Sequence, residues 1–408
     1  MRKVSSLLLL VCLMMFLCTV LCGCDSYDNF IKTFVLKEAE VVPDPEEKVL
    51  IGVFEPLTGP DAPAAADEVK GIELAHSLYS EVLGKEIELV YGDNCSDDTI
   101  AVQAAQSLVD QGVCVVLGSY RNILSLAGSD VFRESRTPAI TITCTNPLIT
   151  QSNPYYARAC FIDADQGKSA AAYGLSALKS SWFTVFMEAG DDYSSTMADQ
   201  FMAEASSYLG NDYSVAVITY PKGTVDFSLY LEKMCIMRTG PVFFPSDAKS
   251  GEEVIWQAAQ LGYDFEWIGC SKWNALGEAA AAAGRNSVSH LDGVCFVADY
   301  DVDESLSHMT SVFHETYAKA YGTEEEPSKS VALGFDAYLL AVEAIRQAGR
   351  SDAGTLIANK LTNITDFAGV TGNMYMNSIG DPMKDVVIEV FHNGVYSAGY
   401  KVSPDWGD

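Results

Sequence analysis

Short apolar segments of strand character alternate with helical patterns along most of this chain, and this alternation restricts the fold more than any other feature. The strand segments are apolar at successive positions, so we expect both faces of each strand to be covered. Helices that join such strands place them in a parallel sheet with helices on both sides. The first series has strands expected at 49–54, 86–93, 113–119 and in PAITIT, with helices expected at 69–83, 100–112 and in LAGSDVFRESR.

A second series of the same kind follows a long loop, TNPLITQSNPYYARACF. Two such halves in tandem predict an α/β protein of two Rossmann-like lobes around a central cleft, because open parallel sheets bind ligands beyond the carboxyl ends of their strands. Near the end of the chain, HNG between two apolar runs predicts a hairpin turn. In this second series, helices are expected at 167–179, 194–209, 227–237 and 251–262, and strands at 182–188, 214–221, 241–246, 265–270 and 291–300; two long helical patterns, SLSHMTSVFHETYAKAYG and SVALGFDAYLLAVEAIRQAG, come later.

The N-terminus has the organisation of an export signal. Arg2 and Lys3 precede an apolar run from Leu7 to Leu21, and the run closes with small residues before Cys24. This ending resembles a bacterial lipobox, in which the signal peptidase cuts before the cysteine and the thiol carries a lipid. We therefore expect a lipoprotein signal peptide at 1–23 and a lipidated, polar tether at 24–48, on the outer side of the cell membrane. A plain secretory signal and a single transmembrane anchor are the alternatives, although the run is short for a bilayer span.

Composition and charge exclude several function classes. A formal net charge of −29 disfavours binding to nucleic acid and to anionic lipid headgroups. An acidic coat that keeps an exported protein soluble explains this charge, and recruitment of a basic partner is the alternative. Beyond Cys24 the cysteines are scattered without a C-x-x-C pair and the five histidines do not cluster, so neither a metal site nor a cofactor is expected. One disulfide is left open.

Eight ordered motifs between about Val49 and Tyr400 carry a family resemblance. They are IGVFEPLTGPDA, KGIELA, YGDNCSDDTIAVQAAQSLVDQGVCVVLGS, RTPAITITCT, ARACFIDADQG, GDDYSSTMAD, WQAAQLGYDFEWIG and GFDAYLLAVEAI. In this order they resemble the type I periplasmic solute-binding proteins, in the branched-chain amino acid (Leu/Ile/Val) branch of ABC transporter receptors. The resemblance implies an N-terminal lobe of 49–164 plus 300–366 and a C-terminal lobe of 165–299 plus 367–408. The chain would cross between them near 163–167, 298–301 and 365–369.

The resemblance places several ligand contacts on the first lobe. Gly118 ends a strand, and SYRN then opens a helix whose N-terminal N–H groups can accept a carboxylate. Asn122 occupies a position where the family commonly has a carboxylate-binding serine, and Tyr120 and Arg121 lie beside it. Thr143 and Thr145 match strand-end positions that meet the amino and carboxylate groups of the ligand, and Thr145 is the expected main anchor. Arg121 could meet a further acidic group.

The resemblance places the remaining contacts on the second lobe. Tyr193 in GDDYSS matches a tyrosine that closes over the ligand, and Asp247 follows a strand at a second such position. Ser271, Lys272 and Trp273 stand where amino acid binders of this family usually place a carboxylate that pairs with the ligand ammonium. That carboxylate is absent here, and a buried ammonium without a partner is costly. Either Asp247 supplies the charge or the ligand is not an ordinary α-amino acid, in which case Lys272 could meet an acidic group.

Each of these residues also has a purely structural interpretation. The alternatives are a helix cap for Asn122, strand packing for Thr143, a surface loop position for Tyr193, solvated charges for Asp247 and Lys272, and a place in the core for Trp273.

Three functions are compatible with these observations. The first is a lipid-anchored receptor that captures an amino acid or related small solute and delivers it to an ABC permease and ATPase complex. The second is a binding protein that reports occupancy to another membrane partner. The third is an extracytoplasmic hydrolase. Its only support is S-x-x-K matches such as 246–249, which chance explains, and the sequence has neither G-x-S-x-G nor H-E-x-x-H. The sequence therefore favours a receptor that is not an enzyme.

Overall fold

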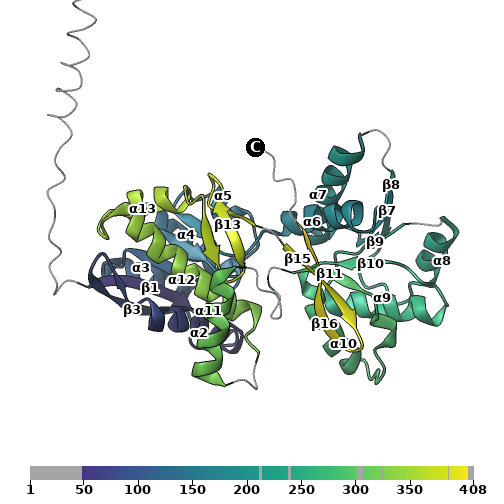
Figure 1. Cartoon of the computed structure of the whole chain (residues 1–408), viewed down its shortest axis with the longest axis horizontal. Helices are drawn as coiled ribbons and strands as arrows, with labels where there is room; N and C mark the ends of the chain where they lie inside the picture. Colours follow the sequence, from purple (N-terminus) through teal and green to yellow (C-terminus); the bar gives the residue numbers. More distant parts are fainter. Residues whose placement is uncertain are drawn as a thin grey trace, which may run out of the picture. The chain divides into compact units, whose positions relative to one another are not determined.

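Two sheet-based lobes make up the chain from Lys48 onward in a computed structural model (Figure 1). The structure describes residues 48–210, 214–237, 240–298, 300, 307–322, 326–384 and 386–402. The expected signal peptide, the lipidation site at Cys24 and the tether up to residue 47 lie outside these ranges. None of the helices in the described ranges combines the length and the apolarity that a bilayer crossing requires.

The first lobe is built on a six-stranded sheet in the order β2-β3-β1-β4-β5-β6. All neighbours are parallel except the short β2, which pairs antiparallel with β3. The strand order reverses at β1, so the carboxyl ends of β1 and its neighbours form a switch point of the kind where open α/β sheets bind ligands. The strands are β1 (Val49–Glu55), β2 (Glu81–Val82), β3 (Lys85–Asp93), β4 (Val115–Gly118), β5 (Ala139–Thr141) and β6 (Tyr156–Arg158).

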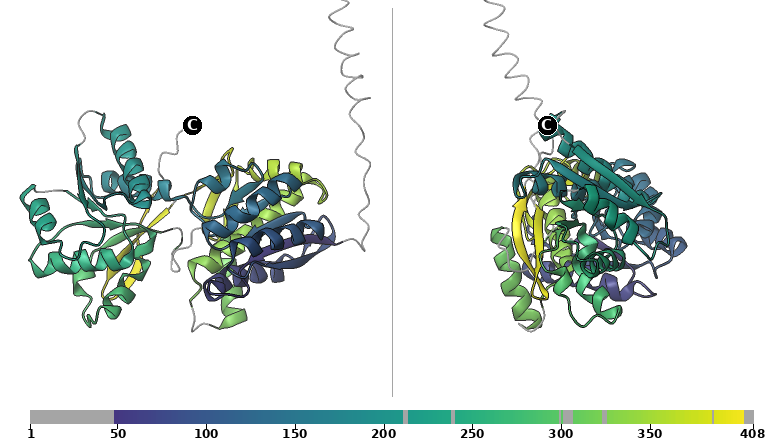
Figure 2. Two further views of the ribbon diagram at one scale, coloured as in Figure 1. Left: turned by 180° about the vertical axis from the view of Figure 1, so that it is seen from behind. Right: turned by 90° about the vertical axis from the view of Figure 1, so that its right-hand side faces the viewer.

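Helices cover both faces of this sheet, as Figure 2 shows from two directions. Alternate residues of β1 enter two different apolar clusters: Ile51 and Val53 pack with α2 and α12, whereas Phe54 packs with α3 and α4. This two-sided burial explains why the strands are apolar at successive positions. The helices are α2 (Ala62–Leu78), α3 (Asp98–Asp110), α4 (Asn122–Ser135), α5 (Leu148–Gln151), α11 (His308–Tyr321), α12 (Lys329–Ala348) and α13 (Gly354–Leu361).

A small three-stranded antiparallel sheet also belongs to the first lobe. It consists of β12 (Phe367–Gly369), β13 (Gly372–Met376) and β14 (Pro382–Lys384). Its apolar residues join the cluster around α12, and the buried Asp336 of that helix accepts hydrogen bonds from the backbone N–H groups of Val370 and Thr371. The sequence-based boundary at 366/367 is therefore wrong, because 367–384 packs with the first lobe. The chain passes between the two cores at Val386 and Val387. The Val387 side chain belongs to the core of the first lobe, and the Val386 side chain belongs to the core of the second lobe.

The second lobe is built on a seven-stranded sheet in the order β16-β15-β11-β10-β9-β7-β8. Figure 1 shows the last part of the chain, in yellow, in both lobes. The predicted hairpin with HNG at its turn is confirmed, with Asn393 and Gly394 both at positive φ. The strands are β7 (Trp182–Glu188), β8 (Ser214–Tyr220), β9 (Val242–Phe243), β10 (Trp267–Gly269), β11 (Cys295–Ala298), β15 (Val386–His392) and β16 (Val395–Val402).

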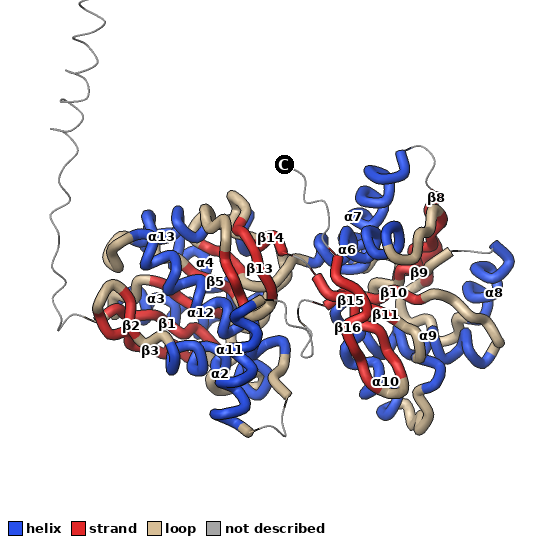
Figure 3. Tube along the Cα trace, viewed as in Figure 1, coloured by secondary structure: helices blue, strands red, loops and turns tan. Residues whose placement is uncertain are grey.

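Helices of the second lobe alternate with these strands, as Figure 3 shows by colour. Their apolar side chains and those of the sheet form one cluster that includes Phe186, Phe243 and Trp273. The helices are α6 (Asp163–Ser176), α7 (Asp192–Leu209), α8 (Ser228–Met237), α9 (Ala248–Gln260) and α10 (Leu276–Ala282), with 3₁₀ turns at η2 (Ser271–Ala275) and η3 (Ser289–Leu291).

Several segments differ from the sequence-based expectation, since α10, α13 and the strands β12 to β14 are not among the expected elements. The expected loop from Thr145 to Phe161 contains α5 and the sixth strand, β6, of the first sheet. The helix expected at 69–83 begins earlier and ends at Leu78, because a proline is tolerated in the first turn of α2 and Glu81–Val82 forms β2. The seven described cysteines are free thiols, and five of them are buried.

Candidate functional site

The carboxyl ends of the first sheet bring together the loops that follow β1, β3, β4 and β5. The loop after β1 is fixed by Asp93 at the end of β3. The two carboxylate oxygens of Asp93 accept hydrogen bonds from the Leu57 N–H at 2.9 Å and from the Thr58 hydroxyl at 2.7 Å. Partial burial acts to raise the pKa of Asp93, but the hydrogen bonds from Thr58, Cys95 and Leu57 outweigh it and lower that pKa. The edge is therefore held in place before any solute arrives.

Two fully buried glutamates lie under this edge. Glu55 is the last residue of β1 and Glu68 lies in α2, and both side chains are 0% exposed. Glu55 Oε2 accepts a 2.7 Å hydrogen bond from the Tyr120 N–H, and Glu68 Oε1 accepts one of 2.5 Å from the Thr143 hydroxyl. Among the described residues, Glu55 Oε1 and Glu68 Oε2 have no hydrogen-bond donor, and each carboxyl group shifts the pKa of the other. A proton shared between two carboxyl groups is the ordinary way to satisfy two such oxygens.

Gly118 makes room for this arrangement at the end of β4. Its φ is +115°, and a Cβ atom there would lie 2.4 Å from Glu55 Oε1 and 2.2 Å from the carbonyl oxygen of Phe54. Only glycine allows the backbone of β4 to pass so close to the carboxyl group. The predicted strand end at Gly118 therefore also shapes the acidic pair.

Tyr120, Arg121 and Asn122 connect β4 to α4. The Tyr120 N–H is used by Glu55, and the half-exposed Arg121 pairs with Asp61 at 2.9 Å. Asn122 is the first residue of α4, and its Oδ1 accepts a 3.3 Å hydrogen bond from the Asn146 N–H. This bond orients the side chain so that its NH₂ group can still donate. The N-terminus of α4 and the Asn122 amide thus face the same loop, 143–146, that carries the two predicted threonines.

Arg158 supports that loop from within the core. Its side chain is 0% exposed, its Nη1 and Nη2 donate to the carbonyl oxygens of Cys144 and Asn146 at 2.8 and 2.9 Å, and its Nε contacts Asp381 at 2.5 Å. The two carbonyls flank Thr145, which is partly exposed. The guanidinium therefore fixes the backbone on either side of the residue that the sequence analysis expects to bind the ligand carboxylate.

The predicted residues of the second lobe form a separate group at the carboxyl ends of its own strands. Lys272 Nζ lies 3.4 Å from the centre of the Tyr193 ring, a cation–π contact. The Tyr193 hydroxyl donates to the Sγ atom of Cys270 at 3.5 Å, and the Ser271 N–H donates to Gln166 Oε1 at 2.8 Å. Burial raises the pKa of Tyr193, so its hydroxyl keeps its proton. This group contributes a cation, an aromatic face and neutral polar groups, and the Asp163 carboxylate of α6 acts on both Tyr193 and Cys270.

Two predicted residues have structural roles in the second lobe. Asp247 is the N-cap of α9, and its Oδ1 accepts a 2.8 Å hydrogen bond from the Ser250 N–H. Trp273 is 0% exposed, packs against Gly251 and Gly269, and donates from its indole N–H to the Ser246 hydroxyl at 3.2 Å. The Trp273 ring therefore belongs to the core of the lobe rather than to a surface that a solute reaches.

Sequence reasoning missed Glu55, Glu68 and Arg158. Each left a signal: a carboxylate ends the apolar run VLIGVFE, another lies in the helical segment DEVKGIELA, and an arginine occurs in the mostly apolar YYARACF. A charged residue within a buried segment is rarely there without a partner. Each of the three contacts a residue far away in the sequence: Tyr120, Thr143 and Asp381. Short motifs therefore could not reveal these contacts.

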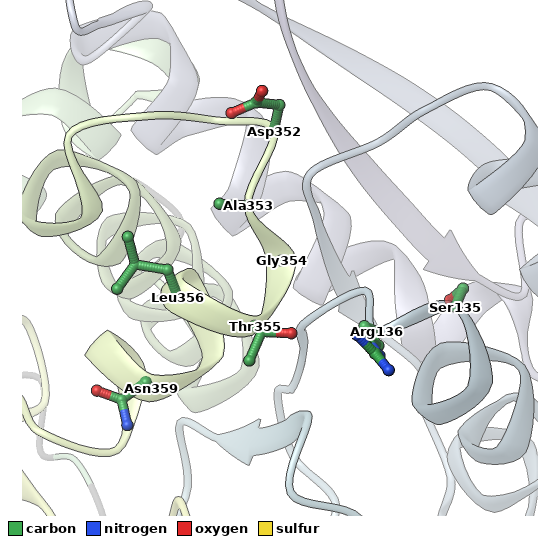
Figure 4. Close-up of a pocket in the computed structure, with 8 residues that line it drawn as sticks. All are labelled: Ser135, Arg136, Asp352, Ala353, Gly354, Thr355, Leu356 and Asn359. Atoms are coloured by element: carbon green, nitrogen blue, oxygen red, sulfur yellow. The ribbon is translucent and has the colours of Figure 1, made fainter. Parts of the chain in front are cut away.

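A cavity of about 650 Å³ lies elsewhere on the first lobe (Figure 4). Ser135 and Arg136 at the C-terminal end of α4 and Gly354 and Thr355 at the start of α13 are among its lining residues. Because α4 leads into the amino end of β5, this cavity is at the opposite edge of the sheet from Thr143 and Thr145. None of the predicted ligand-binding residues lines it.

Comparison with known proteins gives consistent results. A family model described as periplasmic binding protein matches residues 48–383. The Leu/Ile/Val-binding protein homolog 1 of Brucella abortus (strain 2308) is 24% identical over 341 residues, covering 82% of this chain and 87% of that protein. The leucine-binding protein LivK of Thermotoga maritima superposes with a TM-score of 0.69 at 29% identity, covering 88% of this chain and 99% of that one. LivJ of Streptococcus pneumoniae, a branched-chain amino acid transporter substrate-binding protein solved with isoleucine, gives 0.67 at 24% identity, with coverages of 88% and 100%.

Proposed function

The chain belongs to the periplasmic binding protein family, and we propose that it is the solute receptor of an ABC importer that binds a branched-chain amino acid or a closely related amine-bearing acid. The observation that carries this proposal is the polar edge of the first lobe, where the N-terminus of α4, Asn122 and Thr145 lie together. The names of the relatives, which refer to the binding of leucine, isoleucine or valine, support the same ligand class.

The carboxylate of the solute binds, in this proposal, at the start of α4. The first N–H groups of a helix have no partner within the helix and carry partial positive charge, which suits an anion. The Asn122 NH₂ group and the Thr145 hydroxyl add two donors. Arg158 holds the backbone on both sides of Thr145, so little ordering accompanies binding.

The second lobe closes over the solute through Tyr193 and Lys272. A solute that contacts both lobes stabilises the closed arrangement over the open one, which is how binding is signalled to a membrane partner. The partners in this proposal are the permease and ATPase of the importer, and the solute leaves the receptor chemically unchanged.

The location of the receptor is part of the proposal. The sequence from Met1 to Cys24 supports export and attachment of a lipid to the Cys24 thiol. Metabolic labelling with a fatty acid tests this directly: the natural chain incorporates label, Cys24→Ser does not, and Cys22→Ser still does. Label in the Cys24→Ser variant would contradict the assignment.

Binding itself is tested with a panel of solutes. Thermal unfolding is followed with each of the branched-chain amino acids, other amino acids, amides and dicarboxylates, and hits are measured by calorimetry. A solute at 100 times its Kd adds about 2.7 kcal/mol to the free energy of unfolding. We expect leucine, isoleucine or valine to stabilise the protein and to be recovered intact afterwards. A panel without an amino acid hit would contradict the ligand class, and turnover of the solute would contradict the receptor function.

A further inference from the structure

The buried pair Glu55 and Glu68 has an unusual charge balance. No arginine or lysine among the described residues hydrogen bonds to either carboxyl group. Arg121 pairs with Asp61, and Arg158 pairs with Asp381. The ionisable groups that influence the pair are Asp67, Tyr120, Cys144 and Tyr156, none of which is a cation. Two carboxyl groups in such surroundings cannot both be charged at modest cost.

Burial acts on the protonation of both groups in the same direction. It raises the pKa of Glu55 well above the ordinary value, and it raises the pKa of Glu68 to about 7 despite the hydrogen bond from Thr143. The pair therefore holds a proton in the empty protein, and a nearby cation would favour its loss.

The hydrogen bonds of the pair also determine which neighbouring groups are left to donate to a solute and which can only accept. The Thr143 hydroxyl donates its proton to Glu68, so towards a solute this oxygen can only accept. The Tyr120 N–H donates to Glu55 and does not serve a solute carboxylate. Both Thr143 and Tyr120 are partly exposed, whereas the carboxyl groups beneath them are covered. An acceptor backed by negative charge suits an ammonium group.

The second lobe offers no equivalent carboxylate in the segment where one was expected. Ser271, Lys272 and Trp273 occupy that segment, and Asp247 caps α9. Lys272 would repel an ammonium group placed there. Asp163 at the start of α6 acts on Tyr193 and Cys270, but the segment 271–273 itself supplies no counter-charge, and the buried pair of the first lobe is a second acidic source for a solute that carries an amine.

From this geometry we propose that Glu55 and Glu68 are positioning residues for the amine of the solute: they recognise its ammonium group through the Thr143 hydroxyl and release their shared proton when it binds. The inference rests on the proposed receptor function. It adds which residues recognise the amine of the solute. The step is balanced: a pair with one proton and a solute with an ammonium group become a pair without that proton, the bound solute and one proton in the buffer.

Calorimetry with two probes tests this. Leucine and 4-methylpentanoate share their carbon skeleton and carboxylate, but only leucine has the amine. At pH 7, titrations in buffers of different ionisation enthalpy give the number of protons exchanged. We expect a net release approaching one proton per leucine and none for 4-methylpentanoate, which binds at least about tenfold more weakly because it forms no charge-assisted hydrogen bond. Equal affinities, or leucine binding without proton release, would overturn the inference.

Variants of the pair separate recognition from folding. Glu68→Gln keeps the size of the side chain, and we expect it to abolish proton release and weaken leucine about tenfold or more, with 4-methylpentanoate unchanged. The control is Asp165→Asn in α6 of the second lobe, a buried carboxyl whose pKa burial also raises to about 7. It should leave leucine-linked proton release as in the natural chain. Unchanged release in Glu68→Gln would contradict the inference.

Failure of this inference is distinguishable from failure of the receptor function. If a solute without an amine binds best, the protein is still a receptor and the pair has no role in recognition. If nothing in the whole panel binds, both the receptor function and this inference are wrong. Circular dichroism of each variant shows whether it is folded, so that a loss of binding or of proton release is not mistaken for a loss of structure.

Discussion

The carboxyl edges of the two lobes carry different polar groups. Under the edge of the first lobe lie two buried carboxyl groups, Glu55 and Glu68, whose bonds to Tyr120 and Thr143 determine which groups can serve a solute. The corresponding edge of the second lobe has Lys272 stacked on Tyr193. Similar α/β frameworks thus carry different chemistry, and our proposal assigns recognition of an amine to the first lobe.

The two edges also differ in how they are supported. Loop 143–146 of the first lobe is held from below by a fully buried ion pair between Arg158 and Asp381, which lies between β13 and β14. Lys272 and Tyr193 of the second lobe are held by a ring contact and a weak bond to Cys270. In the proposed receptor, the first lobe is therefore the preorganised half, and the second lobe contributes the groups that would adjust on closure. Four predictions test this comparison.

The largest effect is expected from Arg158→Met. It leaves Asp381 buried without its cation, which costs about 3–5 kcal/mol of the free energy of unfolding. Denaturant unfolding measures this loss. The matched control is Arg350→Met, which breaks the exposed pair with Asp352 and should cost less than about 1 kcal/mol. Equal losses in the two variants would mean that the buried pair does not support the loop.

The pH dependence of stability is the next effect. The Glu68 pKa of about 7 in the folded protein exceeds its ordinary value of 4.5, so the folded state keeps a proton that the unfolded chain releases. Stability is therefore fully present below about pH 4.5 and declines as pH rises to about 7, by on the order of 3 kcal/mol for this group.

Chemical denaturation of the empty protein at a series of pH values measures this decline. Glu68→Gln should remove the part of this decline in stability that Glu68 causes. Asp165→Asn should remove a separate part, which arises in the second lobe. Retention of the whole slope in Glu68→Gln would show that the pair does not hold the proton.

Thr145→Ala tests the carboxylate anchor of the first lobe. Loss of a hydrogen bond to a charged group costs about 1.5–3 kcal/mol, so leucine should bind roughly 10- to 150-fold more weakly. Calorimetry measures the affinity, and the exposed Thr196→Ala on α7 is the control that should bind normally. If affinity survives the Thr145 change, the carboxylate binds elsewhere.

The smallest effect is expected from Lys272→Met in the second lobe. The exposed cation–π contact is worth about 0.5–1 kcal/mol, so the affinity for leucine should change only about two- to fivefold. Lys249→Met, an exposed lysine of α9, is the control. A loss for leucine as large as that of Thr145→Ala would mean that the second lobe carries a main anchor.

The sequence predicts the alternation of strands and helices well because both faces of each sheet strand are buried and leave a clear apolar pattern. It misses β6 and α5, which are too short to show a period, and it assigns 367–384 to the wrong lobe because Asp336 and Val370 meet only in the folded chain. In the site, positions such as Asn122 and Thr145 could be found from motifs. The Glu55–Glu68 pair could not, since its two carboxyl groups are brought together by packing of α2 against β1 and its neighbours.

A crystal structure of the protein with leucine tests the central claim most directly. We predict that the leucine nitrogen lies within hydrogen-bond distance, about 3 Å, of Thr143 Oγ1, with the carboxylate at Asn122 and Thr145. A leucine whose nitrogen instead contacts a group of the second lobe, with Thr143 and the buried glutamates uninvolved, would contradict the account.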